Sequence, residues 1–262
     1  MKTLAAACVL ALLPLGAGWA AEEPEPINPD RAGAATSAAT VGRGAIQIEA
    51  GLAYEHERVA GSPSERRFTV EATLRAGVTE RLELRVQGEP LVRLRGAEDA
   101  TDHGDFGLGA KYRFLDAPEG SWRPSLALLP FVTLPVSEPP IGTGKTDFGA
   151  LLLASFALPA QMSLDVNAGL AAIGQTRPGG YLLQAIVAAG GSRDVAAGLT
   201  LFSDVFYTSR DERASRDSVV LDAGVVWRPT RDVAFDASGV TSLTGPGPDW
   251  AVRAGVSVRF GR

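Results

Sequence analysis

The side chains with the clearest potential for catalysis are the two histidines and the serines near one of them. His56 and His103 are the only histidines of the 262-residue chain, and Ser62 and Ser64 follow His56 within one polar segment. A hydrolase would need a serine within hydrogen-bond reach of a histidine that an acid orients. A flexible polar segment offers no fixed geometry of this kind, so we expect no catalytic residues and no enzyme activity.

Two further motifs match parts of nucleotide-binding signatures without their context. Gly142-Thr143-Gly144-Lys145-Thr146 contains the end of a phosphate-binding loop, but the full pattern requires a glycine where Pro139 stands and a helix afterwards. Asp105-Phe106-Gly107 and Asp147-Phe148-Gly149 match the metal-binding triplet of kinases, without the lysine strand or the catalytic loop. No group of residues has the spacing of metal ligands. The sequence therefore predicts neither a cofactor nor a metal site.

Charged side chains recur at every second position of otherwise apolar segments. From Trp250 to Phe260, each even position is apolar and each odd position is small or charged. This period of two predicts a β-strand with one apolar and one polar face, and the segments 46–55, 68–76 and 105–114 repeat it. Repeated strands of this kind occur in soluble sandwiches with an apolar interior and in membrane barrels with an apolar exterior.

The first residues have the composition of a secretory signal. Residues 1–20 are predicted to be a signal peptide, because a lysine at the start is followed by an apolar stretch over 4–15 and a small-x-small sequence at 18–20. Nothing in the chain reaches the ~20 consecutive apolar residues of a membrane-spanning helix. The single cysteine, Cys8, lies in this leader, so we expect a mature protein without disulfides or thiol ligands.

About twelve strand candidates follow one another from Gly44 to the end of the chain. They lie near 44–56, 66–78, 81–94, 104–115, 123–135, 147–158, 161–173, 181–191, 195–208, 217–228, 231–243 and 249–260. Short turns alternate with longer polar loops: the turns at 77–81, 158–161, 191–194 and 228–232, the somewhat longer connection at 115–123, and the loops at 57–65, 95–103, 136–146, 174–180, 209–216 and 244–248. This alternation, with an even strand number, is typical of a bacterial outer-membrane barrel.

The two faces of these strands also favour a membrane barrel over a soluble sandwich. A sandwich would leave large charged surfaces on both sheets and few paired core layers. In a bilayer the apolar face needs no partner, and closure of the barrel satisfies every backbone group. Aromatic residues beside both the loops and the turns fit two interfacial girdles. The sequence therefore predicts an all-β fold, a transmembrane antiparallel up-and-down β-barrel over residues 44–262.

The polar face of such a barrel would line its lumen. Charged side chains dominate on strands one to four and on the last strand, and apolar side chains on strands five to eight. The predicted lumen-lining residues are Glu49, Glu71, Arg75, Glu83, Arg85, Asp105, Lys111, Arg113, Leu129, Phe131, Ile186, Arg253 and Arg259. Residues 21–43 are rich in Pro, Ala and Thr without periodicity, and we expect an extended segment that stays in the periplasm or plugs the lumen.

Several motifs carry a resemblance to a known family. They are Pro26-Ile27-Asn28-Pro29-Asp30-Arg31, Thr36-Ser37, Thr40-Val41-Gly42-Arg43-Gly44 leading into residues 46–51, then 78–85, 104–113, 128–130 and 133–135. In these motifs the whole mature chain resembles the family named for a "MetA-pathway of phenol degradation". The resemblance implies an outer-membrane barrel with a transporter role, and the family name implies aromatic-compound degradation.

We therefore expect a passive channel or transporter for small, aromatic or amphiphilic solutes. An anionic group of the solute would be attracted by the cationic side chains of Arg75, Arg85, Lys111 and Arg253. The apolar part of the solute would contact an apolar wall of Leu129, Phe131 and Ile186. One alternative is a closed-lumen structural barrel whose inward side chains only hold the wall together. An adhesion barrel is disfavoured because the loops have only ~5–12 residues, and an outer-membrane lipid hydrolase is also disfavoured.

The expected location is the outer membrane of a Gram-negative bacterium, after cleavage of the leader. The expected partners are outer-membrane lipid, the barrel-assembly machinery through the C-terminal strand, and the small-molecule solute. A formal net charge of −5, with no run of Lys or Arg, argues against nucleic acid as a partner.

Overall fold

The computed structural model describes residues 25–261, except residues 59–60, 62, 119 and 177–178. The predicted signal peptide, residues 1–20, lies outside this range. The strands are β1 (Ile46–Glu57), β2 (Glu65–Gly77), β3 (Leu82–Arg95), β4 (Ala100–Asp102), β5 (Phe106–Leu115), β6 (Ser125–Leu134), β7 (Asp147–Leu158), β8 (Met162–Gln175), β9 (Gly180–Ala196), β10 (Leu199–Thr208), β11 (Ser218–Trp227), β12 (Val233–Thr244) and β13 (Trp250–Phe260). Among the described residues, no helix is long and apolar enough to cross a membrane.

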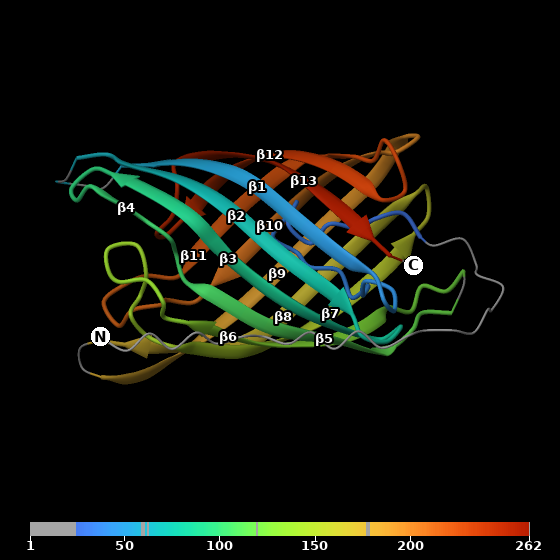
Figure 1. Cartoon of the computed structure of the whole chain (residues 1–262), viewed down its shortest axis with the longest axis horizontal. Helices are drawn as coiled ribbons and strands as arrows, with labels where there is room; N and C mark the ends of the chain where they lie inside the picture. The colour runs from blue at the N-terminus through green and yellow to red at the C-terminus, as the bar shows by residue number, and fades with distance from the viewer. Residues whose placement is uncertain (1–24, 59–60, 62, 119, 177–178, 262) are drawn as a thin grey trace, which may run out of the picture.

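Twelve of these strands close into an antiparallel barrel (Figure 1). Strands that follow one another in sequence pair with one another, and β1 also pairs with β13 along its length, which closes the ring. The short β4 extends the sheet beside the far end of β3, and β5 then pairs with the first half of β3. The predicted all-β, up-and-down antiparallel barrel is confirmed, with β4 as an additional short strand.

The strands present apolar side chains outward and polar or small side chains inward. On β1, Leu52 is 51% exposed, whereas Glu49 is completely buried. On β7, Leu152 is 46% exposed and the next residue, Leu153, is completely buried. Because successive side chains of a strand point to opposite faces, this pattern covers the outside of the barrel with Leu, Val and Ile. Such a continuous apolar surface suits contact with lipid.

Aromatic side chains cluster on the outer surface at both ends of the barrel. At the end with the long loops, the rings of Tyr54 and Trp250 lie 5.7 Å apart. At the end with the short turns, Trp227 stacks on Phe235 with their ring centres also 5.7 Å apart. Two aromatic belts of this kind match the two water–lipid interfaces that a membrane barrel crosses.

One predicted turn is wrong. The sequence suggests a turn at residues 191–194, but β9 continues through them and the chain reverses at Ala197-Gly198. Gly198 has a φ of +70°, a conformation that glycine adopts without strain. Gly190 lies inside the ladder, where a Cβ would overlap the carboxylate of Asp204. Gly190, next to the predicted turn, therefore marks a close approach inside the barrel, whereas a Cβ on Gly191 would meet no other atom within 4 Å.

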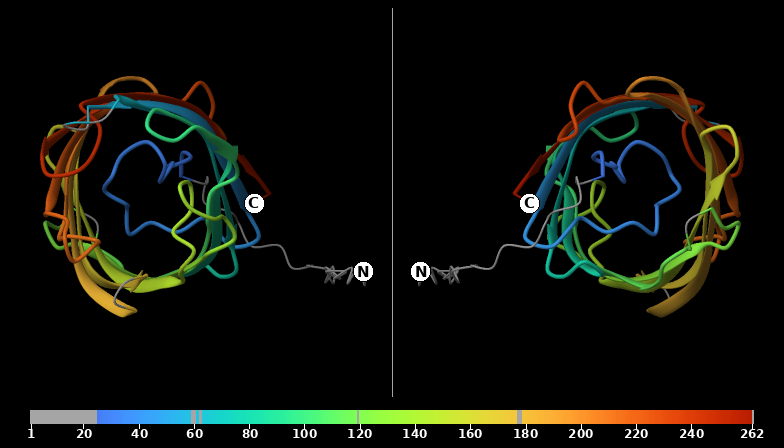
Figure 2. Two further views of the ribbon diagram at one scale, coloured as in Figure 1. Left: turned by 90° about the vertical axis from the view of Figure 1, so that its left-hand side faces the viewer. Right: turned by 90° about the vertical axis from the view of Figure 1, so that its right-hand side faces the viewer.

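Two segments without strand structure lie inside the barrel (Figure 2). Residues 25–45, here called the N-terminal segment, enter at the short-turn end, where the Ile27 N–H donates to the carbonyl of Arg231 at 2.8 Å. The loop 135–146 bends inward from the opposite end. Its Ser137 N–H donates to Asp105 Oδ1 at 3.0 Å, and its Thr143 N–H to Oδ2 at 3.1 Å.

The two ends of the barrel are predicted to face different compartments. We expect the short turns in the periplasm and the long loops outside the cell, as in outer-membrane barrels. On intact cells, a membrane-impermeant maleimide should label Ser64→Cys in a long loop and leave Thr230→Cys in a short turn unlabelled. Both positions are exposed. The reverse pattern of labelling would contradict this orientation.

The outer face should tolerate charge less well than the inner face. Leu152 lies midway along β7 between Phe148 and Phe156, so Leu152→Arg should lower the free energy of unfolding by about 2–4 kcal/mol in lipid. Thr133→Arg, which points into a cavity of the lumen, is the matched control and should have a smaller effect. Denaturant unfolding in vesicles measures both changes, and equal penalties would disprove the assignment of faces.

Candidate functional site

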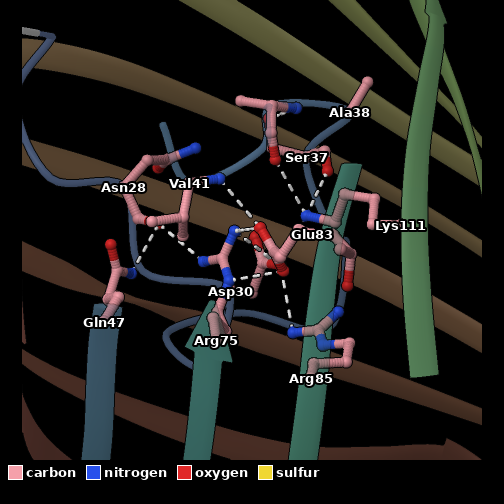
Figure 3. Close-up of polar contacts among 12 residues, drawn as sticks. Asn28, Asp30, Ser37, Ala38, Val41, Gln47, Arg75, Glu83, Arg85 and Lys111 are labelled. Carbon is pink, nitrogen blue, oxygen red and sulfur yellow. Dashed lines mark hydrogen bonds and ion pairs between the residues drawn. The ribbon is translucent and has the colours of Figure 1, made fainter. Parts of the chain in front are cut away.

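A cluster of ionised side chains lies where the N-terminal segment meets the wall of the barrel (Figure 3). Asp30 Oδ2 accepts hydrogen bonds from Lys111 Nζ at 2.6 Å and from Arg85 Nη2 at 3.1 Å. It also lies 3.4 Å from Nη2 of Arg75. All four side chains are buried, at 7% exposure or less. One carboxylate of the segment is thus held by three cations of the wall.

Arg75 links this carboxylate to two acids of the wall. Its Nε and Nη2 atoms donate to the two carboxylate oxygens of Glu83, both at 2.8 Å. Its Nη1 atom donates to Glu49 Oε1 at 2.9 Å and to the carbonyl of Asn28 at 3.0 Å. This bidentate contact with Glu83 orients the guanidinium and neutralises its charge.

The register of the strands brings these side chains together. Arg75 on β2 lies directly opposite Arg85 on β3, and Glu83 on β3 lies directly opposite Lys111 on β5. Opposite residues on neighbouring strands have their Cβ atoms about 5 Å apart. The alternation of each strand therefore sets a compact group of charges inside the barrel, close to its short-turn end.

The charges around Asp30 keep its carboxyl group ionised. Burial alone would raise the pKa of this group, but the neighbouring charges of Arg75, Lys111 and Arg85 lower it to about 2. At neutral pH the segment therefore presents a full negative charge to the wall.

Arg31 forms a second anchor on the other side of the segment. Its guanidinium pairs with Glu71 at 3.0 Å and with Asp236. Gly51 and Gly255 lie directly opposite each other on β1 and β13, and a Cβ on either would overlap this guanidinium. The two glycines leave the space in which Arg31 lies against the wall.

Polar side chains of the wall bind the backbone of the rest of the segment. Asn167 accepts from the N–H of Thr36 at 2.7 Å and donates to its carbonyl at 2.8 Å. The other contacts are Ala35 N–H to Asp204 at 3.1 Å, Ala38 N–H to Ser155 at 2.8 Å and Val41 N–H to Glu83 at 2.9 Å. Because residues 28–41 of the segment lie outside the strand ladders, these side chains satisfy backbone groups that would otherwise be left unpaired in the lumen.

A cavity of about 560 Å³ lies in the lumen beside the N-terminal segment. Asp30 and Arg31 of the segment line it, and Ile141 of the loop 135–146 reaches it. Charged side chains of β1, β2, β3 and β13, with Asp105 just before β5, line one side. The apolar side is formed by Leu129, Phe131, Leu151, Ile186 and Phe206.

The predicted lumen residues fall into three groups. Those that line the cavity are Glu49, Glu71, Arg85, Asp105, Leu129, Phe131, Ile186 and Arg253. Arg75, Glu83 and Lys111 lie in the buried cluster around Asp30. Arg113 and Arg259 lie at the short-turn end, where they pair with Asp116 and Asp232.

Sequence reasoning did not identify the wall residues that bind the segment elsewhere. Asp204, Asp236 and Asn167 each lie on the inward face of a strand, but none was distinguished by charge pattern or motif. The alternation of β10 and β12 is the signal that could have placed both aspartates in the lumen. Their partners could not be inferred, because they belong to the segment without periodicity.

The motifs with catalytic potential have other roles in the structure. His56 stacks on Trp250, with their rings 5.6 Å apart, and His103 contacts the carbonyl of Gly104. Within the described residues, no serine hydrogen-bonds to either histidine, and Ser62 lies outside them. The loop with Gly142–Thr146 binds the Asp105 carboxylate through its backbone. In the same described range, no group of three or more His, Cys, Asp or Glu side chains could hold a metal ion.

Comparisons with known proteins agree on a family and a fold. A family model described as "Putative MetA-pathway of phenol degradation" matches residues 29–260. An outer membrane channel from Pseudomonas putida F1 has a similar structure, with a TM-score of 0.69, 12% identity, and coverage of 89% of this chain and 100% of that one. The NanC porin has a TM-score of 0.53 and 9% identity, with coverage of 81% of this chain and 98% of that one. The translocator domain of autotransporter NalP from Neisseria meningitidis has a TM-score of 0.51 and 15% identity, with coverage of 84% of this chain and 90% of that one. No curated protein sequence matches the chain.

Two arginines predicted in the lumen should differ in their importance for stability. Arg75→Met leaves Glu49 and Glu83 buried without their partner, and should lower the free energy of unfolding by about 3–5 kcal/mol. Arg113→Met breaks a partly exposed pair with Asp116 and an exposed hydrogen bond to the carbonyl of Glu80, and should cost at most about 1 kcal/mol. Denaturant unfolding of both variants in the same lipid measures the difference, and similar small losses would show that the cluster is not a stabilising centre.

Proposed function

The chain belongs to the family described as "Putative MetA-pathway of phenol degradation", and we propose that it is a passive outer-membrane channel or transporter for small solutes, including aromatic and amphiphilic ones. The cavity of the lumen is the observation that carries this proposal. Its volume of about 560 Å³ falls in the range of small-molecule sites. One side is charged and the other apolar, which suits a solute with a polar group on an apolar body.

The N-terminal segment is the main obstacle to passage. It lies inside the barrel (Figure 2) and is anchored to strands on several sides by Asp30, Arg31 and backbone hydrogen bonds. We propose that it acts as a plug that restricts the short-turn half of the lumen. Passage then depends either on movement of part of this segment or on space left beside it.

A closed-lumen structural barrel is the second candidate. The buried cluster around Asp30 favours it, because ion pairs among wall and segment would hold the lumen shut. An adhesion role has less support, since the loops of the barrel are short. We propose no catalytic step, and therefore no lipid hydrolase.

The location and partners that we propose follow from the same architecture. The apolar outer face and its aromatic belts support contact with outer-membrane lipid. The strand β13 ends at Phe260 and would present the assembly machinery with its C-terminal signal. Residues 1–20 would be removed during export.

Conductance across a planar bilayer tests the channel directly. We expect the mature chain to conduct weakly and a chain without residues 25–43 to conduct several-fold more, because the deletion removes the plug from the lumen. Swelling of liposomes in small aromatic acids provides a second readout for both forms. As a control, the mobility of the deleted chain on gels without heating shows whether it still folds. Absence of conductance and swelling in both folded forms would support the closed structural barrel instead.

A further inference from the structure

The wall of the barrel has more positive than negative charge at the cluster around Asp30. Arg75, Arg85 and Lys111 supply three cations, and Glu49 and Glu83 supply two anions. The third anion is Asp30, which belongs to the N-terminal segment and not to the wall. Among the wall side chains in ion-pair contact there, cations thus outnumber anions by one, and Asp30 balances them; Asp165 on β8, bonded by Ser155, adds a more distant carboxylate.

Two of the three cations depend entirely on the segment for hydrogen bonds. In the part of the chain that the structure describes, Arg85 donates only to Asp30 Oδ2. Lys111 donates to the same oxygen and to the carbonyls of Ser37 and Ala39, at 2.9 and 3.0 Å. Arg75, in contrast, is bound by the wall acids Glu49 and Glu83. Arg85 and Lys111 are thus the wall cations that are available to whatever occupies the lumen.

The cavity gives a solute access to this position. Asp30 and Arg85 both line it, and the apolar side chains of Leu129, Phe131 and Ile186 line it as well. Among the described residues, the buried Nε atom of Arg85 has no hydrogen-bond partner, and neither has Oδ1 of Asp30. Asp30 therefore accepts a single hydrogen bond from the Arg85 guanidinium, which could bind a carboxylate through two parallel hydrogen bonds.

We propose that Arg85 and Lys111 form a carboxylate subsite for an amphipathic anionic solute, and that Asp30 occupies this subsite in the resting chain. This inference rests on the proposed function, because it names the solute class of the same lumen. The solute places its carboxylate on Arg85 and Lys111 and its apolar body against Leu129, Phe131 and Ile186. One carboxylate replaces another, so the charge of the cluster does not change.

The remaining anchors of the segment allow this exchange to be local. Arg31 pairs with Glu71 and Asp236, and Thr36 bonds to Asn167. None of these contacts involves Arg85 or Lys111. The side chain of Asp30 can therefore turn away from the subsite while the N–H groups of Asp30 and Arg31 stay bonded to Glu49 and the following part of the segment stays attached to the wall.

Binding of 1-naphthoate to the refolded mature chain tests the proposal. Asp30→Asn removes the internal competitor with little change in shape, and should tighten naphthoate binding about tenfold in equilibrium dialysis. The neutral analogue 1-naphthalenemethanol should bind both forms equally. Asp211→Asn, an exposed acid in the loop after β10, is the matched control and should change neither affinity.

Substitution of the cation gives an independent measurement. Arg85→Gln in an otherwise unchanged chain should weaken naphthoate binding about tenfold and leave the alcohol unaffected. This variant keeps the test decisive if Asp30→Asn does not refold. The subsite would be overturned if Asp30→Asn raised the affinities for naphthoate and the alcohol equally, or if Arg85→Gln did not lower the affinity for naphthoate.

The conductance experiment separates this inference from the proposed function. A chain that conducts but binds naphthoate and the alcohol alike refutes the subsite and leaves the channel standing. A chain that does not conduct, but whose naphthoate affinity rises in Asp30→Asn, supports the subsite and refutes the channel.

Discussion

Arg75 and Arg85 lie directly opposite each other on β2 and β3, and both point into the lumen. Two buried cations at this separation repel each other, and each is costly to remove from water unless anions and hydrogen bonds compensate it. Glu49 and Glu83 compensate Arg75, which leaves Arg85 dependent on a carboxylate from outside the wall. Asp30 of the N-terminal segment meets that requirement, and together with the contacts of Arg31 and Thr36 it keeps the segment inside the barrel.

With Asp30 held by the wall, the neighbouring residues of the segment have little freedom. Arg31 is directed between Glu71 and Asp236. The small side chains Ala32 and Ala38 pack into two separate apolar clusters, the first with Val226 and Ala234 and the second with Ala127, Leu129 and Leu153. Small residues are required here because the segment runs close to the wall on several sides. The lumen is thereby divided into a region filled by the segment and a cavity beside it.

The parts of this structure that depend on local alternation could be predicted from the sequence. The period of two placed Arg75, Glu83 and Lys111 on the inward face, and the loop lengths indicated a closed barrel of about twelve strands. The predicted turn at 191–194 was wrong because these residues continue β9, which pairs through them with β8 and β10. The partners of the inward charges were also beyond reach. Asp30 and Arg85 are 55 residues apart, and the segment that carries Asp30 has no periodicity to place it.

The charges around the cavity suggest how an anionic solute could be selected. Five acids line it, Asp30, Glu49, Glu71, Glu89 and Asp105, against three bases, Arg31, Arg85 and Arg253. An excess of acids gives no long-range attraction for an anion, because steering requires a field of the opposite sign. Cationic side chains predicted to draw an anion inward are mostly neutralised by acids of the wall or the segment. Recognition of a carboxylate in this lumen therefore has to be a short-range exchange at Arg85, in which the solute takes over hydrogen bonds that Asp30 already makes.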